Sequence, residues 1–191
     1  GDIVPYNSTI SLNDGWDIMG YLNPVPNDIS AMMSPIVDGI TIVKDCCGNN
    51  YWPIFGINTI GEMLPGQGYQ IKTNSPLSFS YPDVNSRLSY TDNDINLQSI
   101  YNIKNTGNNM VVAILEDSWI SPPMLGDEIQ VYDNTGLLVG AAPYRPGVTA
   151  VTVWGNDVTT DLKDGMYVGE KLNFMLQRSD RNKLENINIL S

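Results

Sequence analysis

Glycine and proline recur at short intervals along the whole chain, and this spacing limits most strongly what the chain can fold into. Between positions 44 and 72, the stretch KDCCGNNYWPIFGINTIGEMLPGQGYQIK alone holds five glycines and two prolines. The full sequence of 191 residues has 17 Gly and 12 Pro. Proline breaks helices and glycine weakens them, whereas short strands joined by tight turns accommodate both. The sequence therefore predicts a mainly β fold.

Residues 1–83 predict a small α+β module. Residues 8–22 alternate apolar and polar side chains around an Asn-Asp-Gly turn. This pattern predicts a hairpin that places Trp16 and Met19 on opposite faces. A short helix is predicted near residues 28–37, because apolar residues recur there at helical spacing after an aspartate that can cap the first turn. Further short strands complete the module.

Residues 100–191 predict an antiparallel β-sandwich module, and residues 84–99 predict the linker that precedes it. The linker segment is polar and poor in aliphatic side chains. Alternating segments then follow one another at short spacing, which is typical of a sandwich. The strongest turn signal is Asp-Asn-Thr-Gly at positions 133–136, between EIQVY and LLVGA. It predicts a β-hairpin.

Both halves also carry recognisable motifs. In the first half these are GWD at 15–17, VKDCCG at 43–48, YWP at 51–53 and GQGYQ at 66–70. In the second half they are GDEI at 126–129, G at 136, VG at 139–140, VWG at 153–155, D at 157, DG at 164–165 and GE at 169–170.

These motifs resemble tandem β-rich modules of the type IX secretion cargo proteins of Bacteroidetes, and similar modules are seen in marine phage proteins. The resemblance implies an extracellular or cell-surface protein, with the virion surface as the alternative. Two positions depart from the family pattern. Asp17 stands where the family has Asn, and Cys46 and Cys47 replace polar turn residues.

Composition excludes several classes of function. Histidine is absent, which removes the commonest general base and every His-ligated metal site, so we expect no enzyme. The net charge of −11 disfavours contact with nucleic acid phosphates. No apolar run is long enough to span a membrane. The N-terminal GDIVPYNSTI lacks the basic and apolar regions of a signal peptide, so we expect none within it.

Aromatic side chains near the Tyr-Trp-Pro step are the candidate ligand contacts. Trp52 precedes Pro53 in a segment that we expect at a sheet edge, because proline cannot donate a hydrogen bond to a ladder. Tyr51 and Tyr69 are the further candidates, since an exposed aromatic ring can stack on a sugar or anchor a protein interface. The alternative for Trp52 is packing in the core or between the modules. Trp16 is expected in the core.

The connection GNDVTTDLKDG gathers Asp157, Asp161 and Asp164, which are candidate ligands for Ca²⁺. Calcium takes about six to eight oxygen ligands, and acidic loops supply them. The spacing of the three aspartates does not match an EF-hand. The alternative is that they form Asx turns and caps. We expect no other cofactor.

The only two cysteines, Cys46 and Cys47, are adjacent. Neighbouring Cα atoms lie ~3.8 Å apart across a trans peptide, less than most disulfides span. We therefore expect free thiols at a turn, one facing inward and one outward. A strained vicinal disulfide is the alternative.

The primary function hypothesis is a non-catalytic surface module for adhesion, assembly or contact with a glycan or protein partner, with a homo-oligomer as one form of assembly. The alternative is a phage virion structural protein, such as a capsid decoration, fibre or knob component. A third hypothesis, a carboxylate-based hydrolase, needs two acids that converge. Asp127 and Glu128 are neighbours on a predicted strand and point to opposite faces, so they cannot form that pair directly.

Overall fold

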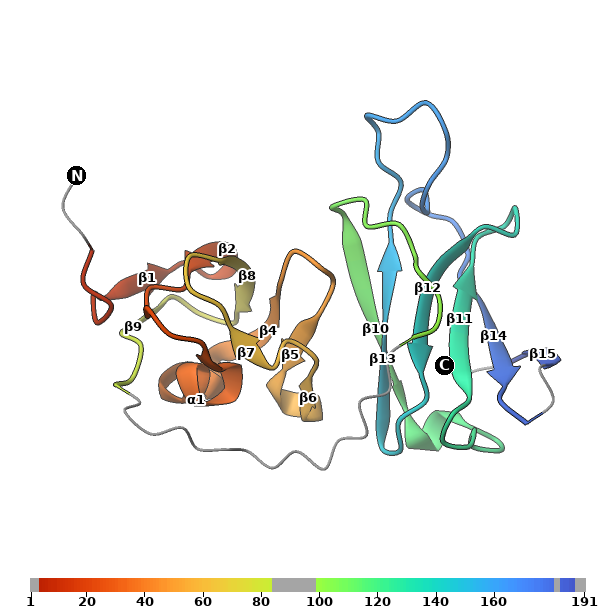
Figure 1. Cartoon of the computed structure of the whole chain (residues 1–191), viewed down its shortest axis with the longest axis horizontal. Coiled ribbons are helices and arrows are strands. Elements are labelled where there is room, and N and C mark those ends of the chain that lie inside the picture. Colours follow the sequence, from red (N-terminus) through yellow and green to blue (C-terminus); the bar gives the residue numbers. More distant parts are fainter. Residues whose placement is uncertain (1–3, 84–98, 181–182, 188–191) are drawn as a thin grey trace. The chain divides into compact units, whose positions relative to one another are not determined.

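The computed structural model describes residues 4–83, 99–180 and 183–187. The chain divides into two compact units, Gly1–Thr91 and Asp92–Ser191, and each is described separately (Figure 1). Both are built mainly from antiparallel strands, which confirms the predicted mainly β fold. The predicted module boundaries fall on either side of the division. Apart from Ser99, the predicted linker 84–99 lies outside the described residues.

Over its described residues, 4–83, the first unit contains one α-helix, two 3-10 turns and nine short strands. In chain order these are β1 (Ile10–Leu12), β2 (Gly15–Gly20), β3 (Asn27–Asp28), α1 (Ile29–Met33), η1 (Ser34–Gly39), β4 (Ile40–Lys44), β5 (Asn50–Trp52), η2 (Pro53–Phe55), β6 (Ile57–Asn58), β7 (Glu62–Met63), β8 (Gly68–Thr73) and β9 (Leu77–Phe79). The main sheet has five strands in the order β2-β8-β4-β5-β6. Two small ladders, β1-β9 and β3-β7, complete the unit.

Helix α1 confirms the short helix predicted near residues 28–37. The side chain of Asp28 caps it, accepting a hydrogen bond from the Ala31 N–H at 3.1 Å. Pro35 then favours the tighter η1 turn over a longer helix. Met32 and Met33 are fully buried beside the sheet, and burying such a side chain contributes about 1.5–3 kcal/mol.

The predicted hairpin across residues 8–22 is wrong. Strand β1 pairs with β9, whereas β2 pairs with β8 in the main sheet. The turn between β1 and β2 therefore passes the chain from one sheet to another. The predicted alternation is nevertheless right for β2, where Met19 is buried and Trp16 is exposed. Each of these two segments pairs with a strand that is distant in sequence and not with its neighbour.

Alternation on β8 determines which side chains face the core of the first unit. Tyr69 and Ile71 are buried, while Gln70 and Lys72 point outward. Tyr81 closes the core, since its hydroxyl donates to the Gly20 carbonyl at 3.0 Å. Burial raises the pKa of Tyr81. The inner and outer faces of the main sheet are thus clearly separated.

The second unit is built from strands and one 3-10 turn. In chain order these are β10 (Asn109–Leu115), η3 (Glu116–Ser118), β11 (Glu128–Tyr132), β12 (Leu138–Pro143), β13 (Val148–Trp154), β14 (Asn173–Arg178) and β15 (Lys183–Asn186). They follow one another in the antiparallel order β10-β13-β12-β11-β14-β15. Figure 1 shows the connection after β13 extending beyond the ends of these strands.

The strands of the second unit fall into two groups, β10-β13 and β12-β11-β14-β15, joined at a single residue pair. Strands β12 and β13 pair only at Gly140 and Val153. The backbones come so close that a Cβ added at Gly140 would lie 2.7 Å from the Thr152 carbonyl oxygen. Side chains from both groups of strands form one buried core, among them Val151 on β13 and Ile129 on β11. The arrangement is therefore sandwich-like.

The Asp-Asn-Thr-Gly hairpin is confirmed between β11 and β12. Gly136 takes a φ of +90°, a conformation that favours glycine. The carboxylate of Asp133 accepts hydrogen bonds from the Thr135 N–H at 2.8 Å and the Leu137 N–H at 2.7 Å. The aspartate thus organises the turn from inside it.

Candidate functional site

The structure separates the three predicted aromatic contacts. Tyr51 and Tyr69 are only 7% and 3% exposed and belong to the core of the first unit. Their assignment as ligand contacts is therefore corrected, because alternation along β5 and β8 turns both rings inward. Trp52 is half-buried and packs edge-to-face on Phe55 at 4.8 Å between ring centroids. Only Trp52 keeps part of its surface available.

The segment around Trp52 is not a sheet edge. Strand β5 pairs with β4 on one side and with β6 on the other. Pro53 lies just beyond β5, where it begins η2, so the missing N–H interrupts no ladder. The proline ends the strand.

An exposed aromatic side chain lies on the outer face of the main sheet of the first unit. Trp16 is 53% exposed and Ile18 beside it on β2 is 73% exposed. Cross-strand pairing places Lys72 opposite Trp16 and Gln70 opposite Ile18. The expectation that Trp16 is a core residue is wrong, because Met19 occupies the inner face instead. We call these outward side chains, together with Lys44, the Trp16 surface.

Two lysines lie over the ring of Trp16. The Nζ atoms of Lys44 and Lys72 are 5.4 Å and 6.0 Å from the ring centroid. Both distances are within the range of a cation–π interaction. Lys44 and Lys72 are the only basic residues between positions 1 and 83. Both basic side chains of residues 1–83 therefore lie at one exposed tryptophan.

Lys44 lies deeper than Lys72, since only 7% of its surface is exposed. Burial lowers the pKa of Lys44. Asn50 lies directly opposite Lys44 in the pairing of β4 with β5, so both side chains are on the outer face. Within the described residues, the buried Oδ1 of Asn50 has no hydrogen-bond partner. A lysine amine and an unsatisfied amide oxygen thus extend the Trp16 surface inward.

Sequence reasoning missed the Trp16 surface, although part of the signal was present. The alternation had already placed Trp16 opposite Met19 and had turned Lys72 outward. The pairing of β2 with β8 could not be read from the sequence, because more than 50 residues separate Trp16 from Lys72.

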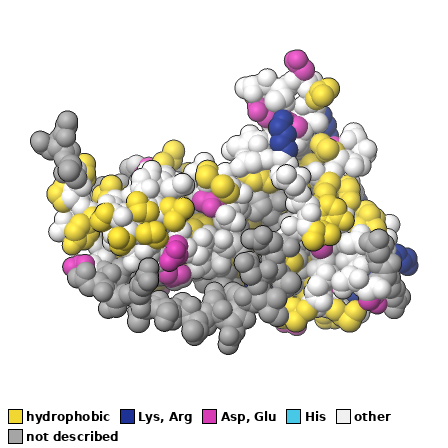
Figure 2. Space-filling view, in the orientation of Figure 1, with side chains coloured by type: hydrophobic (Ala, Val, Ile, Leu, Met, Phe, Trp, Pro, Cys, Tyr) yellow, Lys and Arg dark blue, Asp and Glu magenta, His cyan; other side chains and the backbone are white. Residues whose placement is uncertain are grey.

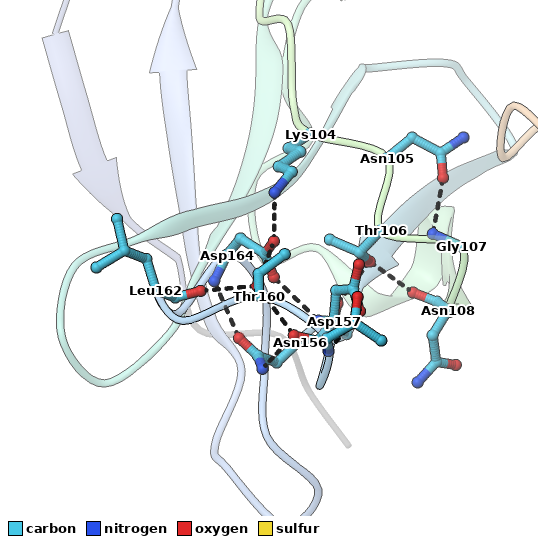
Figure 3. A network of polar contacts seen from close by, with 12 residues as sticks. Lys104, Asn105, Thr106, Gly107, Asn108, Asn156, Asp157, Thr160, Leu162 and Asp164 are labelled. Carbon is cyan, nitrogen blue, oxygen red and sulfur yellow. Dashed lines mark hydrogen bonds and ion pairs between the residues drawn. The ribbon is translucent and has the colours of Figure 1, made fainter.

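The predicted calcium residues lie in the connection between β13 and β14 (Figure 3). Asp164 accepts a hydrogen bond from the Asp157 N–H at 2.9 Å and one from Thr160 Oγ1 at 3.1 Å. It also pairs with Lys104 Nζ at 2.5 Å. Asp161 is exposed. The loop therefore brings together two of the three aspartates.

Protein donors already use the carboxylates of this loop. The pKa of Asp157 is lowered by hydrogen bonds from Thr159, and the pKa of Asp164 is lowered chiefly by Lys104. Searched over the described part of the chain, no group of three His, Cys, Asp or Glu side chains is arranged to hold a metal ion. The hydrogen bonds have the form of Asx turns. Calcium binding at these residues stays a prediction.

The adjacent acids Asp127 and Glu128 bind different partners. Asp127 is fully buried and pairs with Arg178, at 2.9 Å from Nη1 to Oδ2. Glu128 is also buried and accepts a hydrogen bond from the hydroxyl of Ser99. Burial raises the pKa of Glu128. Each carboxylate is therefore enclosed in its own set of contacts.

The two cysteines lie in the turn between β4 and β5, and both are exposed free thiols. The prediction of free thiols at a turn is confirmed, but the expectation that one would face inward is wrong. Their Sγ atoms are 3.3 Å apart. Asp45 fixes the turn by accepting hydrogen bonds from the Cys47 and Asn49 N–H groups, both at 2.8 Å.

A thiol titration of the native protein tests this arrangement. We expect a disulfide reagent to modify two thiols per chain without denaturant. The hydrogen bond with Cys46, followed by burial, raises the pKa of Cys47, so its reaction at neutral pH should be slow. Cys46→Ala removes that hydrogen bond and should speed the reaction of Cys47. A native chain that reacts only after unfolding would show that the thiols are enclosed.

No protein-family model, curated protein or solved structure matches this chain. The resemblance to type IX secretion cargo modules therefore stays a prediction. Where the structure describes the chain, it contains no helix long and apolar enough to cross a membrane.

Proposed function

We propose that this chain is a non-catalytic binding module of an extracellular or cell-surface protein, and that it contacts a glycan or protein partner through the Trp16 surface. One observation carries the proposal: the half-exposed ring of Trp16 lies on a sheet face where Lys44 and Lys72, the two basic residues of positions 1–83, converge. Exposed tryptophan is a typical anchor for sugar rings and for protein interfaces.

The surroundings of Trp16 support a contact surface. Ile18 adds exposed apolar area beside the ring, and Gln70 adds a polar group at its side. Tryptophan, an aliphatic neighbour and polar groups around them resemble the centre and rim of a small interface. Figure 2 shows one face of the first unit, where the visible side chains are mainly hydrophobic with some acidic groups. Lys44 and Lys72, the only basic residues of positions 1–83, both belong to the Trp16 surface.

A glycan array probed with the labelled chain tests the proposal. We expect binding to a subset of glycans, and we expect Trp16→Ala to lose at least about tenfold in signal because truncating an anchor removes most of its contact. Ile54→Ala is the matched control, since Ile54 is 80% exposed but lies away in η2. Circular dichroism should be the same for both variants.

Two results of the array would count against this assignment. Equal signals from Trp16→Ala and the original chain would place the binding site elsewhere. Binding to no glycan would rule out a glycan ligand and leave a protein as the proposed partner. A pull-down with Trp16→Ala as the negative control then tests for such a protein.

A further inference from the structure

The Trp16 surface holds the only two basic side chains of residues 1–83. Residues 1–83 contain eight acidic side chains and only the two lysines, Lys44 and Lys72. The amines of both lysines lie over one aromatic ring. The local excess of positive charge is therefore confined to a single place on the outer face of the main sheet.

Lys72 is placed to meet a negative group from outside. Its side chain is exposed, and within the described residues no carboxylate lies in ion-pair distance of its Nζ. Lys44 adds a second amine on the same face, 5.4 Å from the centre of the Trp16 ring. A carboxylate that approached Lys72 would thus also feel the field of Lys44.

The exposed ring of Trp16 limits which class of ligand can carry that negative group. A pyranose ring has an apolar face of C–H groups, which packs on tryptophan as other apolar surfaces do. Hydroxyl groups on such a ring can donate hydrogen bonds to amide oxygens. Gln70 is exposed on the same face, and its side-chain amide oxygen can accept such a bond.

We propose that the Trp16 surface binds an acidic sugar, with the pyranose ring stacked on Trp16 and its carboxylate held by Lys72 and, at longer range, by Lys44. This inference rests on the proposed function and names its ligand class. A single-stranded nucleic acid also offers rings and negative charge. A nucleic acid carries a phosphate at every nucleotide and needs a row of cations, whereas the Trp16 surface offers two amines at one ring, so the acidic sugar is favoured.

Isothermal titration of the full chain with trigalacturonic acid and with its methyl ester tests the inference. The ester keeps the three sugar rings and removes their charges, so it isolates the role of the carboxylates. We expect the acid to bind at least about fivefold more tightly than the ester, with a difference that shrinks as salt is added.

Variants of the chain show which residues cause the difference in affinity between the acid and the ester. Lys72→Gln should weaken the acid about fivefold and leave the ester unchanged, because only the charge contact is lost. Trp16→Ala should weaken both ligands at least about tenfold. Lys171→Gln removes the same charge from an exposed position in the second unit and should change neither.

Each contrary result has a distinct meaning. Equal affinities for acid and ester, both lost in Trp16→Ala, would overturn the acidic-sugar inference and leave the binding function intact. No binding of either sugar, or tight Trp16-dependent binding of a single-stranded oligonucleotide instead, would also overturn it. Acid binding that survives Trp16→Ala and Lys72→Gln would show that the sugar binds elsewhere, against both proposals.

Discussion

Asp127→Ala is expected to destabilise the second unit strongly while the first unit keeps its stability. The buried carboxylate accepts hydrogen bonds from the N–H groups of Met124 and Ser179, both at 2.9 Å. It also pairs with Arg178. Removing it leaves these donors and a guanidinium without their partner, which costs about 3–5 kcal/mol. That is a large part of the stability of about 5–15 kcal/mol that is usual for a domain.

Hydrogen exchange followed by mass spectrometry resolves the two units. Peptides from β11 to β14 should lose protection in Asp127→Ala, and peptides from residues 4–83 should keep it. Asp117→Ala is the matched control, because Asp117 is exposed, and it should change stability by less than about 0.5 kcal/mol. Equal protection in the two variants would show that Asp127 does not hold the unit together.

The same carboxylate predicts a dependence on pH. Burial alone would raise the pKa of Asp127, but hydrogen bonds from Ser179, Met124 and Arg178 outweigh it and lower the pKa. The ionised form is therefore favoured by folding. Its contribution is present above the unfolded pKa, about 3.9, and is lost as the pH falls through the lowered value. Acid should thus narrow the difference in unfolding free energy between the original chain and Asp127→Ala.

Gly140→Ala is expected to destabilise the second unit by about 3 kcal/mol, the upper end of the usual cost of overpacking. The added Cβ would lie 2.7 Å from the carbonyl oxygen of Thr152 and 3.3 Å from the Cα of Val153. Both are backbone atoms, one of Val153 in the residue pair that joins the two groups of strands and one of Thr152 next to it, so no side chain can rotate away to make room. Urea unfolding measures the loss.

Gly68→Ala is the matched control for this substitution. Gly68 is also in a strand, β8, but a Cβ added there meets nothing within 4 Å. We expect no loss of stability, since alanine lowers the entropy of the unfolded chain without a clash. If Gly140→Ala were as stable as Gly68→Ala, the close joining of β12 and β13 would be wrong.

Local sequence patterns predicted the elements whose causes are local. The capped helix, the Asp133–Gly136 turn and the two faces of β8 all depend on residues within a few positions of one another. The alternating segments of residues 100–191 predict strands for the same reason, because alternation acts over a few residues.

Features set by distant pairing could not be predicted in this way. β1 turns away from β2 to pair with β9, and Trp16 meets Lys72 only because β2 pairs with β8. The core positions of Tyr51 and Tyr69 likewise depend on which face of the main sheet receives α1. A pattern along the chain shows which residues share a face but not which face is covered.

This chain is proposed to bind its ligand through the Trp16 surface. The most direct measurement is the ¹H–¹⁵N spectrum of the full chain titrated with trigalacturonic acid, in which each of the four tryptophans gives an indole N–H signal. We predict that the signals of the Trp16 indole and of the backbone amides of Ile18 and Lys72 shift until the site is saturated with ligand. The indole signals of Trp119 and Trp154 should not shift. Shifts confined to the loop around Asp157, or to the second unit alone, would contradict it.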